Sequence, residues 1–120
     1  MFIAYQVSIE LVQELRNLVP VIKRHDRDLA DQIHRAATSV ALNLAEGQRL
    51  TGGNQRKRYE IAHGSANEVR AAIQVAEAWG YVDDVVAVRH TLDRLLALLW
   101  RLNHGHRHDA PAAKPSTRET

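Results

Sequence analysis

Residues 35–47 read Arg-Ala-Ala-Thr-Ser-Val-Ala-Leu-Asn-Leu-Ala-Glu-Gly and combine small side chains with regularly spaced polar ones. Ser39, Asn43 and Glu46 follow each other at steps of four and three, so they share one face of a helix. An asparagine inside a helix is unfavourable unless its amide is used, because it competes for backbone hydrogen bonds. We therefore expect Asn43 and Glu46 to fix the end of this helix against a neighbouring helix or loop. A ligand-binding role for this polar face is the alternative.

The stretch belongs to a longer helix, because apolar residues recur at every third or fourth position through it and before it. This stripe consists of Leu29, Ile33, Ala37, Val40 and Leu44. Asp28 suits the N-cap of the helix, because a carboxylate there accepts a hydrogen bond from a free backbone N–H. Gly47 suits its end, where a left-handed residue often stops a helix.

An earlier stretch has the same periodicity and predicts a first helix. Its stripe begins at Tyr5, and a second apolar row widens it. Proline lacks a backbone N–H and clashes with the preceding turn of a helix. The helix should therefore end or kink near Val19, just before Pro20, and residues 20–27 should form a connector.

Two later stretches predict a third and a fourth helix. The third should begin after residues 51–54, where two glycines interrupt the periodicity, and should end at Gly80. Asp83 can cap the fourth helix. The fourth helix has the most regular apolar row in the chain, which consists of Val85, Val88, Leu92, Leu95, Leu99 and Leu102.

These four helices define the expected architecture. Short connections make consecutive helices antiparallel, so the sequence predicts an all-α, up-down-up-down four-helix bundle over residues 1–105. A chain of 120 residues has room for one domain of this kind. Residues 106–120 are rich in polar and small residues, which predicts a disordered, flexible C-terminal tail.

Composition excludes several other classes. The chain has no cysteine, so it has neither disulfides nor thiolate metal sites. Its N-terminus lacks the basic and apolar regions of a signal peptide. The longest apolar run, residues 95–100, is far shorter than the ~20 residues that span a bilayer. We therefore expect a cytoplasmic protein that does not associate with a membrane.

The apolar faces are wider than a four-helix core needs. The first helix has two adjacent apolar rows, and Leu96 and Trp100 lie beside the main row of the fourth. A wide apolar surface on a small domain predicts a subunit interface. A fully used core with scattered surface leucines is the alternative.

A second small-residue segment, Ile-Ala-His-Gly-Ser-Ala-Asn-Glu, covers residues 61–68 of the third helix. A glycine inside a helix costs about 1 kcal/mol relative to alanine. We expect Gly64 to compensate for this cost by close backbone contact with the alanine-rich face of the second helix.

The segments at 39–47 and 61–68, together with Arg49 and Trp79-Gly80-Tyr81, resemble the four-helix-bundle family of 23S rRNA intervening-sequence proteins. This family includes accessory proteins of diversity-generating retroelements, and the resemblance covers about residues 5–104. It implies a bundle that assembles into a homopentameric ring. For some members it also implies a basic surface that binds RNA or a reverse transcriptase. Seven residues of these segments form what we interpret as the packing signature of the fold. They are Ser39, Asn43, Glu46, Gly47, Gly64, Ser65 and Glu68.

The chain departs from the family pattern at three positions. The family often has proline at the position of Ala41, and it tends to be apolar at the positions of Gln55 and Arg58. The more polar run Gln-Arg-Lys-Arg at 55–58 adds to a cationic surface.

That surface is the best nucleic-acid candidate in the sequence. Residues 48–79 carry five Lys/Arg against three Asp/Glu, in a chain of net charge +2. Lys and Arg contacts to phosphates supply affinity without reading sequence. The neighbouring aromatic residue, Tyr59, has a buried position in the pattern, so base stacking is poorly supported. A solvated helix terminus is the alternative. The proposed contacts are Arg35, Arg49, Arg56, Lys57 and Arg58.

Catalysis is not expected. No activated nucleophile, glycine-rich phosphate loop or paired carboxylates can be recognised. The only acid/base candidate is His63, if it lies near Asn43 or Glu46. The histidines at 104, 106 and 108 can chelate a metal, but a flexible tail supplies no fixed geometry, so we expect no metal site and no cofactor.

The sequence thus predicts a non-catalytic, oligomeric module that contacts RNA or a ribonucleoprotein. The alternative is a protein-interaction scaffold that docks onto a partner enzyme, such as a reverse transcriptase, without binding nucleic acid itself. Neither function needs a small-molecule substrate.

Overall fold

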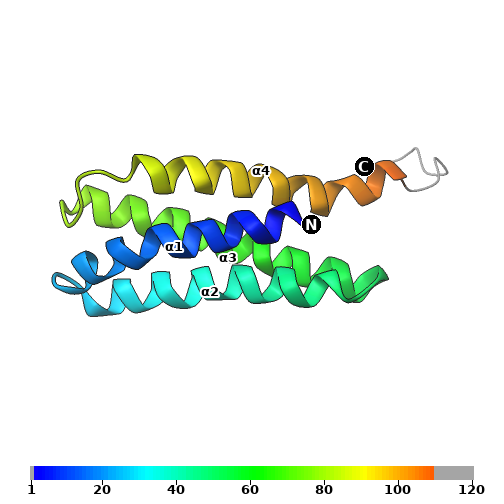
Figure 1. Cartoon of the computed structure of the whole chain (residues 1–120), viewed down its shortest axis with the longest axis horizontal. Helices are drawn as coiled ribbons and strands as arrows, with labels where there is room; N and C mark the ends of the chain where they lie inside the picture. The colour runs from blue at the N-terminus through cyan, green and yellow to red at the C-terminus, as the bar shows by residue number, and fades with distance from the viewer. Residues whose placement is uncertain (1, 110–120) are drawn as a thin grey trace.

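Four helices account for almost all of residues 2–109, the part of the chain that the computed structural model describes. They are α1 (Ile3–Lys23), α2 (Arg27–Gln48), α3 (Gly52–Ala78) and α4 (Val86–Asp109). Each helix runs antiparallel to the next, and α1 and α3 each pack against both α2 and α4 (Figure 1). The predicted all-α, up-down-up-down bundle is therefore confirmed.

The predicted end of the first helix is wrong, because α1 continues through Pro20 to Lys23. Proline removes one backbone hydrogen bond, but the turn that follows it places Ile22 in the core with no exposed surface. Burying such a side chain contributes roughly 1.5–3 kcal/mol, which is of the same size as the cost of the proline. The connector is correspondingly shorter than residues 20–27.

The second helix begins earlier than expected. Its N-cap is Asp26, whose Oδ1 accepts a hydrogen bond from the Leu29 N–H at 3.0 Å. Asp28, the predicted cap, lies in the first turn of α2 instead. A carboxylate there still interacts favourably with the positive end of the helix dipole.

The ends of the other helices agree with the sequence in part. Gly80 follows the end of α3 with φ +78°, and the Tyr81 N–H bonds the Ala76 carbonyl at 2.9 Å, as in a Schellman-type stop. Asp84, and not the predicted Asp83, accepts a hydrogen bond from the Val86 N–H at 3.1 Å. The first backbone N–H of a helix has no partner within the helix, and Asp84 supplies one from two residues before Val86.

The C-terminal part of the chain is helical to Asp109. The first four residues of the predicted tail, 106–109, therefore continue α4. The rest of that prediction concerns residues 110–120, which lie outside the described residues.

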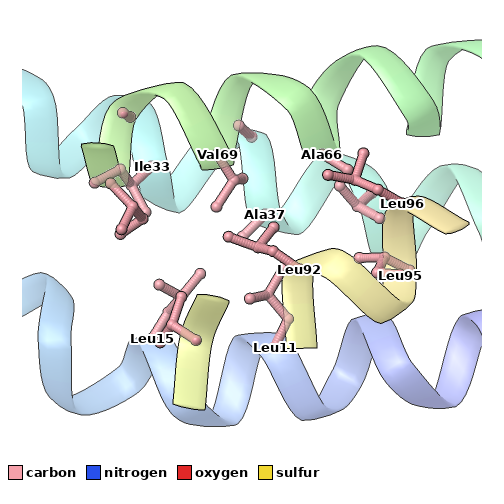
Figure 2. Close-up of a cluster of buried hydrophobic side chains, with 14 of the residues drawn as sticks. Leu11, Leu15, Ile33, Ala37, Ala66, Val69, Leu92, Leu95 and Leu96 are labelled. Carbon is pink, nitrogen blue, oxygen red and sulfur yellow. The ribbon is translucent and has the colours of Figure 1, made fainter. Parts of the chain in front are cut away.

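A single aliphatic core runs along the bundle and receives side chains from all four helices (Figure 2). The second apolar row of α1 belongs to it, since Leu11 and Ile22 are both fully buried. Leu96 is also buried, whereas Trp100 is 51% exposed. Most of the additional apolar residues noted in the sequence are thus used inside the protomer.

Candidate nucleic-acid interface

A row of polar side chains joins α2 to α3. Ser39 and Ser65 face each other with their hydroxyl oxygens 2.9 Å apart. The Asn43 amide donates to the Ser39 carbonyl at 2.9 Å and to its hydroxyl at 3.1 Å. The Asn43 carbonyl oxygen accepts from Arg58 Nη1 at 3.1 Å. Both ends of the Asn43 amide are therefore used, and the interior asparagine links the two helices.

The C-terminal end of α2 is held by two further contacts. Glu46 forms an ion pair with Arg49, whose Nη2 lies 2.9 Å from each carboxylate oxygen. Gln55 of α3 donates its amide to the carbonyls of Gly47 and Leu50, at 3.0 and 2.8 Å. Glu46 thus acts on the terminus of its own helix, and the link to α3 comes from Gln55.

Gly47 does not stop α2 but lies buried in its last turn. A Cβ placed on Gly47 would lie 2.7 Å from Cε1 and 3.0 Å from Cδ1 of Tyr59, and 3.2 Å from Cβ of Arg58. The absence of a side chain is what lets the tyrosine ring pack against the α2 backbone.

The close approach predicted at Gly64 is wrong. Gly64 is exposed, and a Cβ placed on it would meet nothing within 4 Å. Its neighbours Ala62, Ser65 and Ala66 take the inward positions on α3. Glu68, the last member of the predicted packing signature, is exposed and accepts a hydrogen bond from the Gln32 amide at 3.2 Å.

The cationic side chains fall into two groups. Arg35, Arg49 and Arg58 line one open depression on the outer side of α2, together with Ser39 and Asn43. The polar face of α2 and three of the five predicted contacts therefore share one surface, which we call the α2 depression.

Arg56 and Lys57 lie outside this depression. Successive residues of an α-helix are about 100° apart, so Arg56 and Arg58 point to opposite flanks of α3 and Lys57 points between them. Arg35, Arg56, Lys57 and Arg58 are all exposed, and within the described side chains none of them forms an ion pair with a carboxylate. Four of the five predicted contacts are thus free of internal counter-charges.

An aromatic pair lies at the same end of the bundle, which the sequence did not lead us to expect. The rings of Trp100 and His104 stack one turn apart on α4, with centroids 4.1 Å apart and an interplanar angle of 15°. The Asn103 amide donates to the backbone carbonyl of Tyr59 at 3.2 Å, which ties this part of α4 to the cationic start of α3. The sequence could have predicted this pair, because a Trp and a His spaced four residues apart lie on the same face of a helix.

His63 does not line the α2 depression with Asn43 and Glu46. Burial lowers its pKa from the ordinary 6.5, and the positive charges of His104 and Arg70 lower it further. The structure therefore does not bring His63 together with the partners that an acid/base role would need.

Two searches of the described residues bear on metal ions and on membrane spans. Among the described side chains no group of three or more His, Cys, Asp or Glu is arranged to hold a metal ion. None of the helices between residues 2 and 109 has the length and apolar character needed to cross a membrane.

Fold and surface together define a small antiparallel four-helix-bundle protein with a cationic end. The family model described as 23S rRNA-intervening sequence protein matches residues 1–101. The chain therefore belongs to the 23S rRNA-intervening sequence protein family. No curated protein and no solved structure matched the chain.

Proposed function

We propose that this protein is a non-catalytic, oligomeric module that binds RNA or a ribonucleoprotein through Arg35, Arg49, Arg56, Lys57 and Arg58. One observation carries the proposal. Arg35, Arg49 and Arg58 line one depression, Arg56 and Lys57 directly precede Arg58, and four of the five have no carboxylate partner among the described residues.

Unpaired guanidinium groups are well suited to phosphates. They remain charged at all physiological pH values and can donate two parallel hydrogen bonds to an anionic oxygen pair. Each phosphate contact releases condensed counterions, so the affinity depends strongly on salt. Contacts of this kind recognise the nucleic-acid backbone and give little sequence preference.

The outer face of α3 supports oligomerisation. Ile61, Glu68 and Val75 follow each other at steps of seven, and all three are exposed. Gly64, Ala71 and Ala78 repeat the same spacing beside them and are also exposed. Apart from Glu68, these exposed side chains are apolar or small, and a seven-residue repeat of such side chains suits packing against another helix. Assembly into a pentameric ring, as the family resemblance implies, would present the cationic residues five times and raise the avidity of weak contacts.

Filter binding of the full chain to a structured RNA at several salt concentrations tests RNA binding. We expect the logarithm of the binding constant to fall linearly with the logarithm of salt concentration. R56A/K57A/R58A should weaken binding and flatten this slope by up to about 0.9 for each phosphate that the variant no longer neutralises. R16A/K23A/R24A removes the same charge from α1 and the residue that follows it, and it should have a smaller effect. Salt-independent affinity, or equal weakening in both variants, would contradict the proposal.

The alternative function is a scaffold that docks onto a partner enzyme, such as a reverse transcriptase, without binding nucleic acid. It is favoured by large apolar side chains on the surface, notably Leu42 at 64% exposed and Trp79 at 68%. Light scattering coupled to size-exclusion chromatography would test whether the α3 face is used between copies. If V75D dissociates an oligomer but RNA never binds, the scaffold is the better explanation.

A further inference from the structure

The Trp100–His104 pair is held in a defined position on α4. The His104 Nδ1 lies 2.8 Å from the Trp100 backbone carbonyl, and a carbonyl can only accept, so this bond orients the imidazole. The two rings are nearly parallel, and 51% of the Trp100 surface remains exposed. An exposed, pre-oriented aromatic surface can stack a further ring without ordering its side chains again.

The pair lies beside the cationic start of α3. Asn103, between Trp100 and His104, donates its amide to the Tyr59 carbonyl of α3 at 3.2 Å, so this part of α4 lies against the start of α3. His63 follows Arg56 by seven residues, which is about two helical turns and places both on the same flank of α3. The C-terminal part of α4 and the α2–α3 turn also lie at the same end of the bundle (Figure 1). Glu60, between Arg56 and His63, is the acidic group on this flank.

We propose that the Trp100–His104 pair stacks an unpaired base of the bound RNA while Arg56 and Lys57 contact its backbone. This proposal rests on the proposed function. It adds a preference for single-stranded over duplex segments, which the phosphate contacts cannot supply. Base stacking on aromatic side chains is tolerant of sequence, because every base presents a π-face. In a duplex the bases are already stacked on one another and are not accessible.

The second exposed tryptophan provides a matched comparison. Trp79 stacks on Tyr81 with centroids 6.3 Å apart, and Tyr81 stacks on His25 at 4.8 Å. Its neighbours along the chain include Asp83 and Asp84, whose carboxylates repel phosphates. The exposed cations Lys23, Arg24 and Arg27 flank His25, so charges of both signs surround this site. Exposure alone would favour Trp79, so the mixed charge around it is the property that distinguishes the two sites.

Tryptophan fluorescence separates the two sites, because the chain has only two indoles. In the full-length W79F variant every change in emission reports Trp100, and in W100F every change reports Trp79. The probe is a single-stranded RNA of about twelve uridines. We expect it to quench Trp100 and to leave Trp79 nearly unchanged. Quenching of Trp79 alone would overturn the proposal.

Affinity provides the second measurement. W100A should weaken binding of the single-stranded probe roughly 5- to 100-fold at fixed salt without changing the salt slope, since phosphate contacts remain. Binding of a blunt duplex of equal length should change little. W79A is the control, and circular dichroism checks that both variants stay helical.

The outcomes distinguish this inference from the function on which it rests. If R56A/K57A/R58A weakens RNA binding while W100A does not, RNA binding stands and the stacking proposal is wrong. If RNA does not bind at all, both proposals are wrong. Equal weakening of single-stranded and duplex binding by W100A would also overturn the stacking proposal.

Discussion

The two ends of the bundle carry similar aromatic groups in different electrostatic surroundings. At the end formed by the α2–α3 turn and the C-terminal part of α4, Trp100 stacks on His104. Asn103, between them, is bonded to the Tyr59 carbonyl, which follows the cationic residues 56–58 of α3. At the other end, Trp79 stacks in the α3–α4 connection, where Asp83 and Asp84 follow it. An exposed tryptophan is therefore not sufficient to indicate a binding surface, and the charge around it distinguishes the two ends.

The two ends are also stabilised in different ways. At the cationic end, contacts cross from helix to helix, as from Gln55 to Gly47 and from Arg58 to Asn43. At the other end local contacts, such as the Asp26 cap and the Gly80 stop, are joined by the stacking of His25 on Tyr81. Substitutions at the two ends should therefore lower the stability of the protein for different physical reasons.

The largest effect should come from Gly47→Ala. The new methyl group would lie 2.7 Å from the Tyr59 ring, so the ring must move away from α2. Such overpacking typically costs about 1–3 kcal/mol. Urea unfolding of G47A should show the destabilisation, and adding Y59L, which shortens the clashing side chain, should recover part of it. Wild-type stability in G47A would mean that Tyr59 does not pack there.

Gly80→Ala should have the second-largest effect on stability, because of the backbone conformation at this position. Gly80 adopts φ +78°, and its Cβ would meet nothing within 4 Å, so the cost arises only from the left-handed conformation. That cost is roughly 1–2 kcal/mol. Thermal unfolding should find G80N less destabilised than G80A, because asparagine tolerates this conformation better. The opposite order would contradict the assignment.

The corrected N-cap gives a third test. Asp26→Ala removes the acceptor for the Leu29 N–H and should cost about 1 kcal/mol. Asp28→Ala removes only a favourable charge in the first turn, which is worth about 0.3–1 kcal/mol and is screened by salt. Denaturation at low and high salt separates the two, and a larger destabilisation in D28A would restore Asp28 as the cap.

Gly64→Ala should stabilise the protein, in contrast to the preceding substitutions. The position is helical, exposed and open, so alanine should raise the free energy of unfolding by roughly 0.5–1 kcal/mol. Denaturant unfolding, with light scattering on the same sample, measures both stability and assembly. Dissociation of an oligomer together with a lower stability would mean that a second copy needs the space at Gly64.

The smallest effect concerns His63. Its pKa is lowered in the folded state, first by burial and then by His104 and Arg70, so the unfolded chain binds a proton more readily. Stability should therefore be unaffected above the unfolded pKa of about 6.5 and should fall as the pH drops below it. Unfolding at pH 7.5 and 5.5 should show a smaller decrease for H63Q than for the wild type. H90Q, at an exposed position of α4, is the control.

Much of the fold follows from periodicity. At several positions, however, the outcome depends on which residues pack nearby, and the sequence does not show that. The row containing Leu92, Leu95 and Leu99 predicts α4, since the spacing of a helix is local. Pro20 predicts too early an end for α1, because the burial of Ile22 offsets the local cost of the proline. The glycines at 47 and 64 look equally suited to close contact, and only the position of Tyr59 selects Gly47.

The sequence by itself determined four helices, their antiparallel order and a run of cations after the second helix, because all three depend on residues close together in the chain. The tertiary structure decided which side chains meet. It divided the run between the α2 depression, which Arg58 lines, and the flank of α3 that carries Arg56. It also brought Trp100, more than forty positions away, to the same end of the bundle. Such meetings depend on how helices pack, and a pattern of three or four residues contains no information about that.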